Sequence, residues 1–128
     1  MKAYLAISYA NRKHFDKEIN ALKIFFQSKN IDLLVFVDTY NFKPDQEQEM
    51  MQTAFQEMDS CAILIAELST KSIGVGIEIG YAFAQKKPIF YLYNQESTYS
   101  TTAAGSATHI VNYKDAADLI RQLQFLFN

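Results

Sequence analysis

Residues 61–82 read CAILIAELSTKSIGVGIEIGYA, and this stretch decides the fold class. It begins with a continuous apolar run at 61–66, which is typical of a strand that helices cover on both faces, as in a parallel sheet. A polar loop follows, and a helical segment is then predicted over 76–86, where Lys86-Lys87-Pro88 ends it. The stretch therefore predicts a strand–loop–helix unit of an α/β protein.

The same alternation continues on both sides of this unit. Further strands are predicted at 2–8, 31–37, 89–93 and 108–112, and further helices at 13–29, from Pro44 through Met58, and from 115 onward. Such alternation implies right-handed crossovers between parallel strands. We therefore predict that residues 1–128 form a single α/β domain, with a doubly wound, mainly five-stranded parallel sheet flanked by helices, of the flavodoxin or Rossmann type. The polar segment 94–107 is predicted to be a lid, a binding loop or a solvated connection.

Composition limits the classes of partner. Twelve basic and fourteen acidic side chains give a formal net charge of −2, so no electrostatic basis for nucleic-acid binding exists. No stretch approaches the roughly 20 apolar residues of a membrane span, and the N-terminus does not resemble a signal peptide, so we expect a cytoplasmic protein. The single cysteine, Cys61, excludes an internal disulfide, and His14 and His109 have no acidic or Cys neighbours at metal-ligand spacing. We therefore expect no metal and no other cofactor.

Chemistry-bearing residues gather where the 61–66 strand passes into the next helix. Gly74, Gly76 and Gly80 fall within seven residues there. Exposed backbone N–H groups at a helix N-terminus favour an anion such as a phosphate, although the glycines are equally consistent with close helix–strand packing, the role expected for Gly80. Glu78 is predicted in the first turn of the helix, where the helix dipole would keep it ionised, either as a nucleophile or base or as a structural cap.

The segment Glu67–Ala82, with its Ser-x-Gly-Val-Gly-x-Glu-x-Gly pattern at residues 72–80, resembles the nucleoside 2-deoxyribosyltransferase superfamily and, within it, the 2′-deoxynucleoside 5′-phosphate N-hydrolases. The resemblance implies cleavage of an N-glycosidic bond in a nucleotide or nucleoside, by hydrolysis or by deoxyribosyl transfer. It implies that Glu78 is the nucleophile that attacks the anomeric carbon. A carboxylate acting on an oxocarbenium-like transition state agrees with general glycosidase chemistry.

The resemblance also implies roles for other residues. Tyr9 and Ser8 match the loop that orients the nucleophile and the phosphate, and Arg12 is the expected phosphate cation. The 5′ end of the sugar is expected at Ser72, Gly74 and Gly76. Because Ser72 is neutral where transferases of free nucleosides tend to carry Asp, a nucleotide is favoured over a nucleoside. Ser100 or Thr102 matches a hydroxyl that a neighbouring subunit contributes, so a homodimer is implied.

One position departs from the family pattern. The family usually carries an Asp on the second helix that assists the leaving base, and counting back from Glu78 places Ala54 there, with Glu47, Glu57 and Asp59 nearby. Two alternatives therefore stand beside the enzyme: a non-catalytic relative that binds nucleotides, and a TIR-like NAD hydrolase. The second rests on a fainter resemblance of residues 6–10 (AISYA) and Asp38 to TIR domains.

Overall fold

A five-stranded sheet forms the centre of the computed structural model, which describes residues 1–128. The strands are β1 (Lys2–Ile7), β2 (Asp32–Val35), β3 (Ile63–Glu67), β4 (Ile89–Asn94) and β5 (His109–Tyr113). They lie in the order β2-β1-β3-β4-β5, and every neighbouring pair is parallel. This is the flavodoxin-type order, so the predicted fold class is confirmed.

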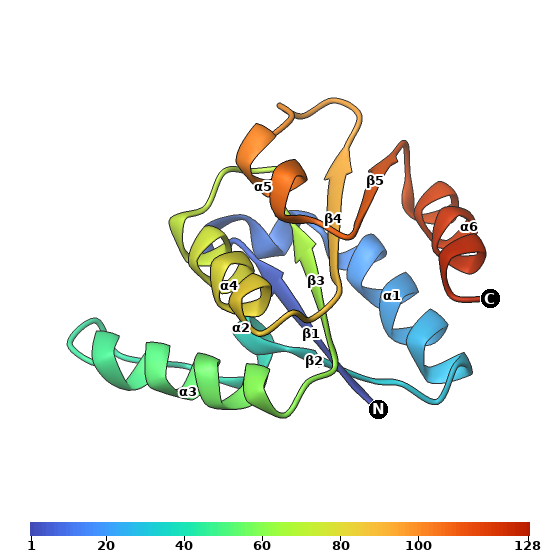
Figure 1. The fold of residues 1–128 in the computed structure, drawn as a ribbon. Coiled ribbons are helices and arrows are strands. Elements are labelled where there is room, and N and C mark those ends of the chain that lie inside the picture. The colour runs from blue at the N-terminus through green and yellow to red at the C-terminus, as the bar shows by residue number, and fades with distance from the viewer.

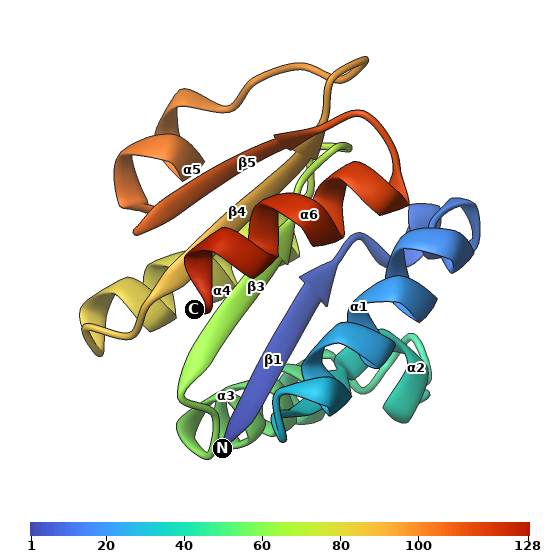
Figure 2. The ribbon, with the colours of Figure 1, turned by 90° about the vertical axis from the view of Figure 1, so that its right-hand side faces the viewer.

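Helices cover both faces of the sheet (Figures 1 and 2). The elements are the 3₁₀ helix η1 (Tyr9–His14), α1 (Asp16–Ser28), α2 (Phe36–Thr39), α3 (Glu47–Asp59), α4 (Ile73–Ala84), α5 (Thr101–Ser106) and α6 (Ala116–Leu126). Figure 2 shows α1 and α6 in front of the sheet, with α3 and α4 behind it. None of these helices combines the length and the apolar character needed to cross a membrane.

Alternate residues of each central strand face opposite layers, which explains the continuous apolar runs in the sequence. In β1, Ala3, Leu5 and Ile7 join the core formed with α1 and α6, whereas Tyr4 and Ala6 join the core formed with α3, α4 and α5. All of these β1 side chains are buried. A tyrosine hydroxyl is therefore carried into the second core, where it needs a hydrogen-bond partner.

Three helix starts differ from the sequence-based expectation by three residues. Helix α1 begins at Asp16 rather than at 13, and α3 begins at Glu47, so Pro44 lies in the turn before it. Helix α4 begins at Ile73 rather than at 76, because the side chain of Ser72 caps it by accepting a hydrogen bond from the backbone N–H of Val75 at 3.3 Å. The strand predicted at 31–37 ends at Val35, because the chain turns into the short helix α2. The polar segment 94–107 also contains a short helix, α5, which the hydroxyl of Ser100 caps at Ala103.

A buried carboxylate joins the carboxyl ends of β3, β4 and β5. Glu67 is 3% exposed, and it accepts hydrogen bonds from the Ser69 backbone N–H at 2.7 Å, the Ser69 hydroxyl at 2.8 Å and the Tyr113 hydroxyl at 2.6 Å. The Ser69 hydroxyl accepts in turn from the Asn94 backbone N–H at 2.8 Å. Burial raises the pKa of Glu67, and these hydrogen bonds oppose that effect. The network fixes the start of the loop that leads to α4.

The Tyr113→Phe substitution tests this network. It removes one donor from a buried carboxylate, so we expect the free energy of unfolding to fall by roughly 1–3 kcal/mol. Urea denaturation measures the change. Tyr99→Phe is the matched control, because Tyr99 is half-exposed and its hydroxyl makes no hydrogen bond within the protein. Equal stabilities for the two variants would contradict a stabilising role for the Glu67 network.

Candidate active site

A cavity of about 560 Å³ opens beside the carboxyl end of β1, on the face of the sheet that carries α3 and α4. We call it the Glu78 cavity. Its lining is formed by residues 5–7 and Tyr9, by 36–37, 40–44, 46–47, 50–51 and 54, and by Ser72, Gly74, Val75 and Glu78. The strand order reverses between β1 and β3, and open α/β sheets bind ligands at such a switch point. The cavity therefore lies where the topology favours a ligand.

Glu78 is the buried carboxylate of this cavity. It lies on the inward stripe of α4 with Val75, Ile79 and Ala82, and it is 8% exposed. The hydroxyl of Tyr4, on β1, donates a hydrogen bond to its Oε2 atom. Glu78 is the only polar member of that stripe, so the fold holds it against the sheet instead of releasing it to solvent.

The predicted place of Glu78 in the first turn of the helix is wrong. Because α4 begins three residues earlier than expected, Glu78 lies in the second turn, where the helix dipole acts weakly. Burial raises its pKa to about 7, and the hydrogen bond from Tyr4 limits the rise. Ionising Glu78 therefore costs folding stability. The protonated Glu78 adds on the order of 3 kcal/mol to the free energy of unfolding. This stabilisation is fully present below the ordinary pKa of 4.5 and is lost as the pH rises through about 7.

The Oε1 atom of Glu78 accepts no hydrogen bond from the protein. Every fully buried side-chain oxygen of the protein does have a hydrogen-bond partner, so Oε1 is not fully buried. This oxygen is therefore accessible from the cavity. A carboxylate that is oriented through one oxygen and open at the other can attack an electrophilic carbon or accept a proton. The geometry provides both possibilities at one atom.

Three of the predicted site residues converge with Glu78. Tyr9, Ser72 and Gly74 all line the Glu78 cavity. Tyr9 is 74% exposed at its mouth, and Ser72 and Gly74 belong to the capped start of α4. Ser8 is half-buried and lies outside the lining, where its hydroxyl accepts a weak hydrogen bond from Asn11 Nδ2 at 3.4 Å.

Arg12 is bound by carboxylates and lines neither of the two cavities at α4. Its guanidinium donates to both oxygens of Asp38, at 2.8 and 2.9 Å, and to Asp16 Oδ1 at 2.7 Å. The hydrogen bond to Asp38 is the main reason that the pKa of Arg12 is raised. The positive charge of Arg12, which was expected to bind a phosphate, is thus already neutralised by Asp38 and Asp16.

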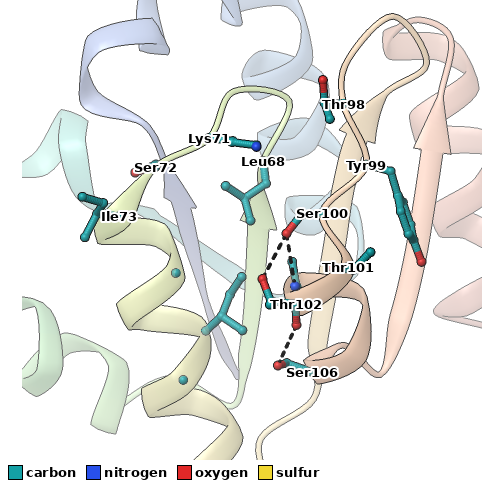
Figure 3. Close-up of a pocket in the computed structure, with 14 residues that line it drawn as sticks. Leu68, Lys71, Ser72, Ile73, Thr98, Tyr99, Ser100, Thr101, Thr102 and Ser106 are labelled. Atoms are coloured by element: carbon teal, nitrogen blue, oxygen red, sulfur yellow. Dashed lines mark hydrogen bonds between the residues drawn. The ribbon is translucent and has the colours of Figure 1, made fainter.

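Gly76, Ser100 and Thr102 line a different cavity, of about 540 Å³, between α4 and α5 (Figure 3). Ser72 is the one residue that lines both cavities. The Ser100 and Thr102 hydroxyls lie 3.3 Å apart on the side of α5 that faces α4. Gly80 lines this cavity too. A Cβ at Gly80 would meet nothing within 4 Å, so the expectation that it packs against the sheet is wrong.

Ala54 leaves the α3 wall of the Glu78 cavity without a carboxylate. It is buried and lines the cavity, as the alignment with Glu78 implied. Two of the neighbouring acids are engaged elsewhere: Glu57 binds Lys2 and Tyr40, and Asp59 binds Tyr81 and Gln85. Only Glu47 reaches the cavity, at its exposed rim.

Sequence reasoning missed Tyr4, and it missed the aromatic group of Phe36, Tyr40 and Phe42 that lines the cavity beside α3. The signal for Tyr4 was a polar-tipped side chain in an otherwise apolar strand, but its partner lies 74 residues away. The aromatic group depends on the short helix α2, whose four residues give no periodicity to detect. No three His, Cys, Asp or Glu side chains gather in a geometry that could hold a metal ion.

Comparison with known proteins places this site in context. The fold is similar to that of a Clostridium botulinum CMP N-glycosidase, with 24% identity and a TM-score of 0.71 over 98% of this chain and 99% of that one. It is also similar to a conserved protein from Enterococcus faecalis, with 18% identity and a TM-score of 0.74 over 98% of both chains. A 2-deoxyribosyltransferase from Bacillus psychrosaccharolyticus matches with 12% identity and a TM-score of 0.72, over 94% of this chain and 90% of that one.

No curated protein matches the sequence significantly. The family model described as nucleoside 2-deoxyribosyltransferase, however, matches residues 3–119. That match spans all five strands and both walls of the Glu78 cavity. The chain therefore belongs to the nucleoside 2-deoxyribosyltransferase family.

Proposed function

We propose that this protein cleaves the N-glycosidic bond of a nucleotide with Glu78 as the nucleophile. Family membership supports N-glycosidic bond cleavage or deoxyribosyl transfer as the general class of reaction. The observation that carries the specific proposal is the buried Glu78 carboxylate, oriented by Tyr4 through Oε2 and open to the cavity at Oε1. The name of the structurally similar CMP N-glycosidase supports a nucleotide as the substrate.

The reaction follows from the position of the open oxygen. Oε1 of Glu78 attacks the anomeric carbon, the bond between that carbon and the base nitrogen breaks, and the electron pair leaves with the base. Water then attacks the same carbon, the sugar is released with the new hydroxyl, the carboxylate is restored, and the remaining proton of the water neutralises the departed base. Another base in place of water would complete a transfer instead. Tyr4 holds the carboxylate in one orientation through both steps.

The 5′ phosphate is placed at the start of α4. Gly74 lines the cavity in the first turn of α4, where helix N–H groups favour an anion, and the neutral hydroxyl of Ser72 does not repel one. Tyr9, at the mouth of the cavity, remains the candidate for orienting the substrate, with Ser8 beside it. Because Asp38 and Asp16 hold Arg12, its predicted contact with the phosphate would require those ion pairs to open.

A second candidate function is nucleotide binding without turnover. The specific observation in its favour is Ala54, which leaves the α3 wall without a group to protonate the departing base. Leaving-group protonation typically contributes about 10²–10⁴-fold to such a rate. This alternative predicts that nucleotides raise the melting temperature but are not cleaved.

We also propose that the protein is a homodimer, with the outward face of α4 as its interface. The exposed residues of this helix are apolar: Ile73, Ile77 and Phe83 are 85%, 47% and 59% exposed, and Gly76 and Gly80 lie between them. A helix that is apolar all round is normally covered. A second copy on this face would also cover the cavity that holds Ser100 and Thr102, as the family resemblance implied.

The Glu78→Gln substitution tests the nucleophile. We expect base release from nucleoside and deoxynucleoside 5′-monophosphates, followed by chromatography, to fall by at least about 10³-fold, because the amide cannot form the glycosyl ester. Glu96→Gln, which alters an exposed carboxylate outside the Glu78 cavity, is the matched control and should retain activity. Release that persists in Glu78→Gln would exclude the proposed mechanism.

The pH profile tests the ionisation of Glu78. Since the carboxylate must be ionised to attack, we expect kcat/KM to rise with pH through an apparent pKa of about 7. Tyr4→Phe removes the hydrogen bond that lowers this pKa, so the inflection should move to higher pH. Tyr99→Phe should leave it in place. An unchanged inflection in Tyr4→Phe would show that the pair does not control ionisation.

Substitution on α4 tests the interface. Ile77→Glu places a charge on the proposed dimer face, so we expect light scattering after size exclusion to report a monomer. Ile24→Glu is the control, because Ile24 is also an exposed isoleucine but lies on α1, at 70% exposure against 47% for Ile77. A wild-type protein that is already monomeric at high concentration would contradict the proposal.

A further inference from the structure

The wall of the Glu78 cavity beside α2 and α3 indicates which kind of base the substrate carries; this inference rests on the proposed function. With the phosphate at the start of α4 and the anomeric carbon at Glu78, the base extends towards α2 and α3. The apolar side chains that are buried or half-buried there are Phe36, Val37, Phe42, Met50, Met51 and Ala54, and the half-buried Gln46 donates an amide N–H to Glu49 Oε2 at 2.9 Å. None of them carries a proton that could be transferred.

The one hydroxyl on this wall is already engaged. Tyr40 donates its proton to Glu57 Oε2 at 2.9 Å. Asn41, Lys43 and Glu47 are exposed at the rim, and Glu47 lies seven residues before Ala54 on α3, about 10 Å away along the helix axis. A neutral base that departed into this wall would leave as an anion with no buried donor beside it.

The same wall suits a positively charged ring. Phe36, Tyr40 and Phe42 form an aromatic group with ring centroids 5.1, 5.8 and 6.2 Å apart, and aromatic faces attract cations. The carboxylate of Glu47 has no hydrogen-bond or ion-pair partner in the protein. Among the charged lining residues, the carboxylates of Glu47 and Glu78 outnumber the single ammonium of Lys43.

We propose that the Glu78 cavity acts on nucleotides whose base carries a formal positive charge, such as a pyridinium or an N7-alkylated purine. Oε1 of Glu78 forms a bond to the anomeric carbon as the bond from that carbon to the ring nitrogen breaks. The electron pair passes to the ring nitrogen and cancels its charge, so the base departs as a neutral molecule without a proton. Water then displaces the sugar from Glu78, and its proton passes to solvent. Cleavage of such a nucleotide needs no acid to protonate the base, so Ala54 can occupy the position where the family usually carries an Asp.

A substrate panel tests the proposal with the full-length protein. Nicotinamide mononucleotide and 7-methylguanosine 5′-monophosphate supply the two kinds of cationic base, and CMP and GMP supply neutral ones, each corrected for its rate without enzyme. We expect Glu78-dependent release at least about 100-fold faster from the cationic pair, the lower range of what leaving-group protonation contributes. Faster release from one cationic nucleotide alone identifies the kind of base. Equal release from both pairs, or release only from CMP and GMP, overturns the proposal while leaving Glu78 as the nucleophile.

Two substitutions add an independent measurement. Ala54→Asp supplies the missing acid, so the ratio of neutral-base to cationic-base release should rise at least tenfold, whereas the isosteric Ala54→Asn should not change that ratio. If Ala54→Asp fails to fold by circular dichroism, the wild-type panel decides alone. If the wild-type protein cleaves CMP and the Glu47→Gln variant does not, Glu47 is the acid that protonates the base, and the proposal is overturned. No Glu78-dependent release from any of the four nucleotides overturns the proposed function as well.

Discussion

The hydrogen bond from Tyr4 to Glu78 is the interaction on which the site depends. It joins strand β1 to α4, and it compensates for placing a carboxylate in the inward stripe of that helix. A buried carboxyl group without a partner would be strongly unfavourable, and no buried side-chain oxygen in this protein lacks one. One oxygen of Glu78 is thus held by Tyr4, and the other is open to the Glu78 cavity. The raised pKa of Glu78 is the energetic consequence of this arrangement.

The rest of the site is arranged around that pair by local capping. Ser72 fixes where α4 begins, and this sets the turn in which Glu78 lies. The loop before it is held at its start by Glu67, Ser69 and Tyr113, on the opposite face of the sheet. The same helix, α4, carries the candidate nucleophile Glu78 on its inward side and exposes Ile73, Ile77 and Phe83 on its outward side. A partner on that face would contact α4 directly.

Much of the fold could be predicted from sequence, because it follows from periodicity. The strand–helix alternation and the parallel sheet depend on patterns within single elements, whereas the convergence of Tyr9, Ser72 and Glu78 was expected from the family resemblance. The remainder depends on contacts between distant residues. Arg12 was expected to bind a phosphate, but Asp38, 26 residues later, binds its guanidinium. Glu78 was predicted in the first turn of its helix, but the helix begins three residues earlier, and burial against the sheet raises the pKa of Glu78. Short helices such as α2 and α5 have too few residues for a periodic signal.

The central claim is that Glu78 forms a bond to the sugar, and intact-protein mass spectrometry tests it most directly. The protein is mixed briefly with a nucleotide analogue fluorinated at C2′, which slows the second step, and is quenched in acid. The account predicts a mass increase equal to the glycosyl phosphate, mapped after proteolysis to the peptide that contains Glu78. Release of base with no adduct on that peptide, or an adduct on another residue, would contradict it.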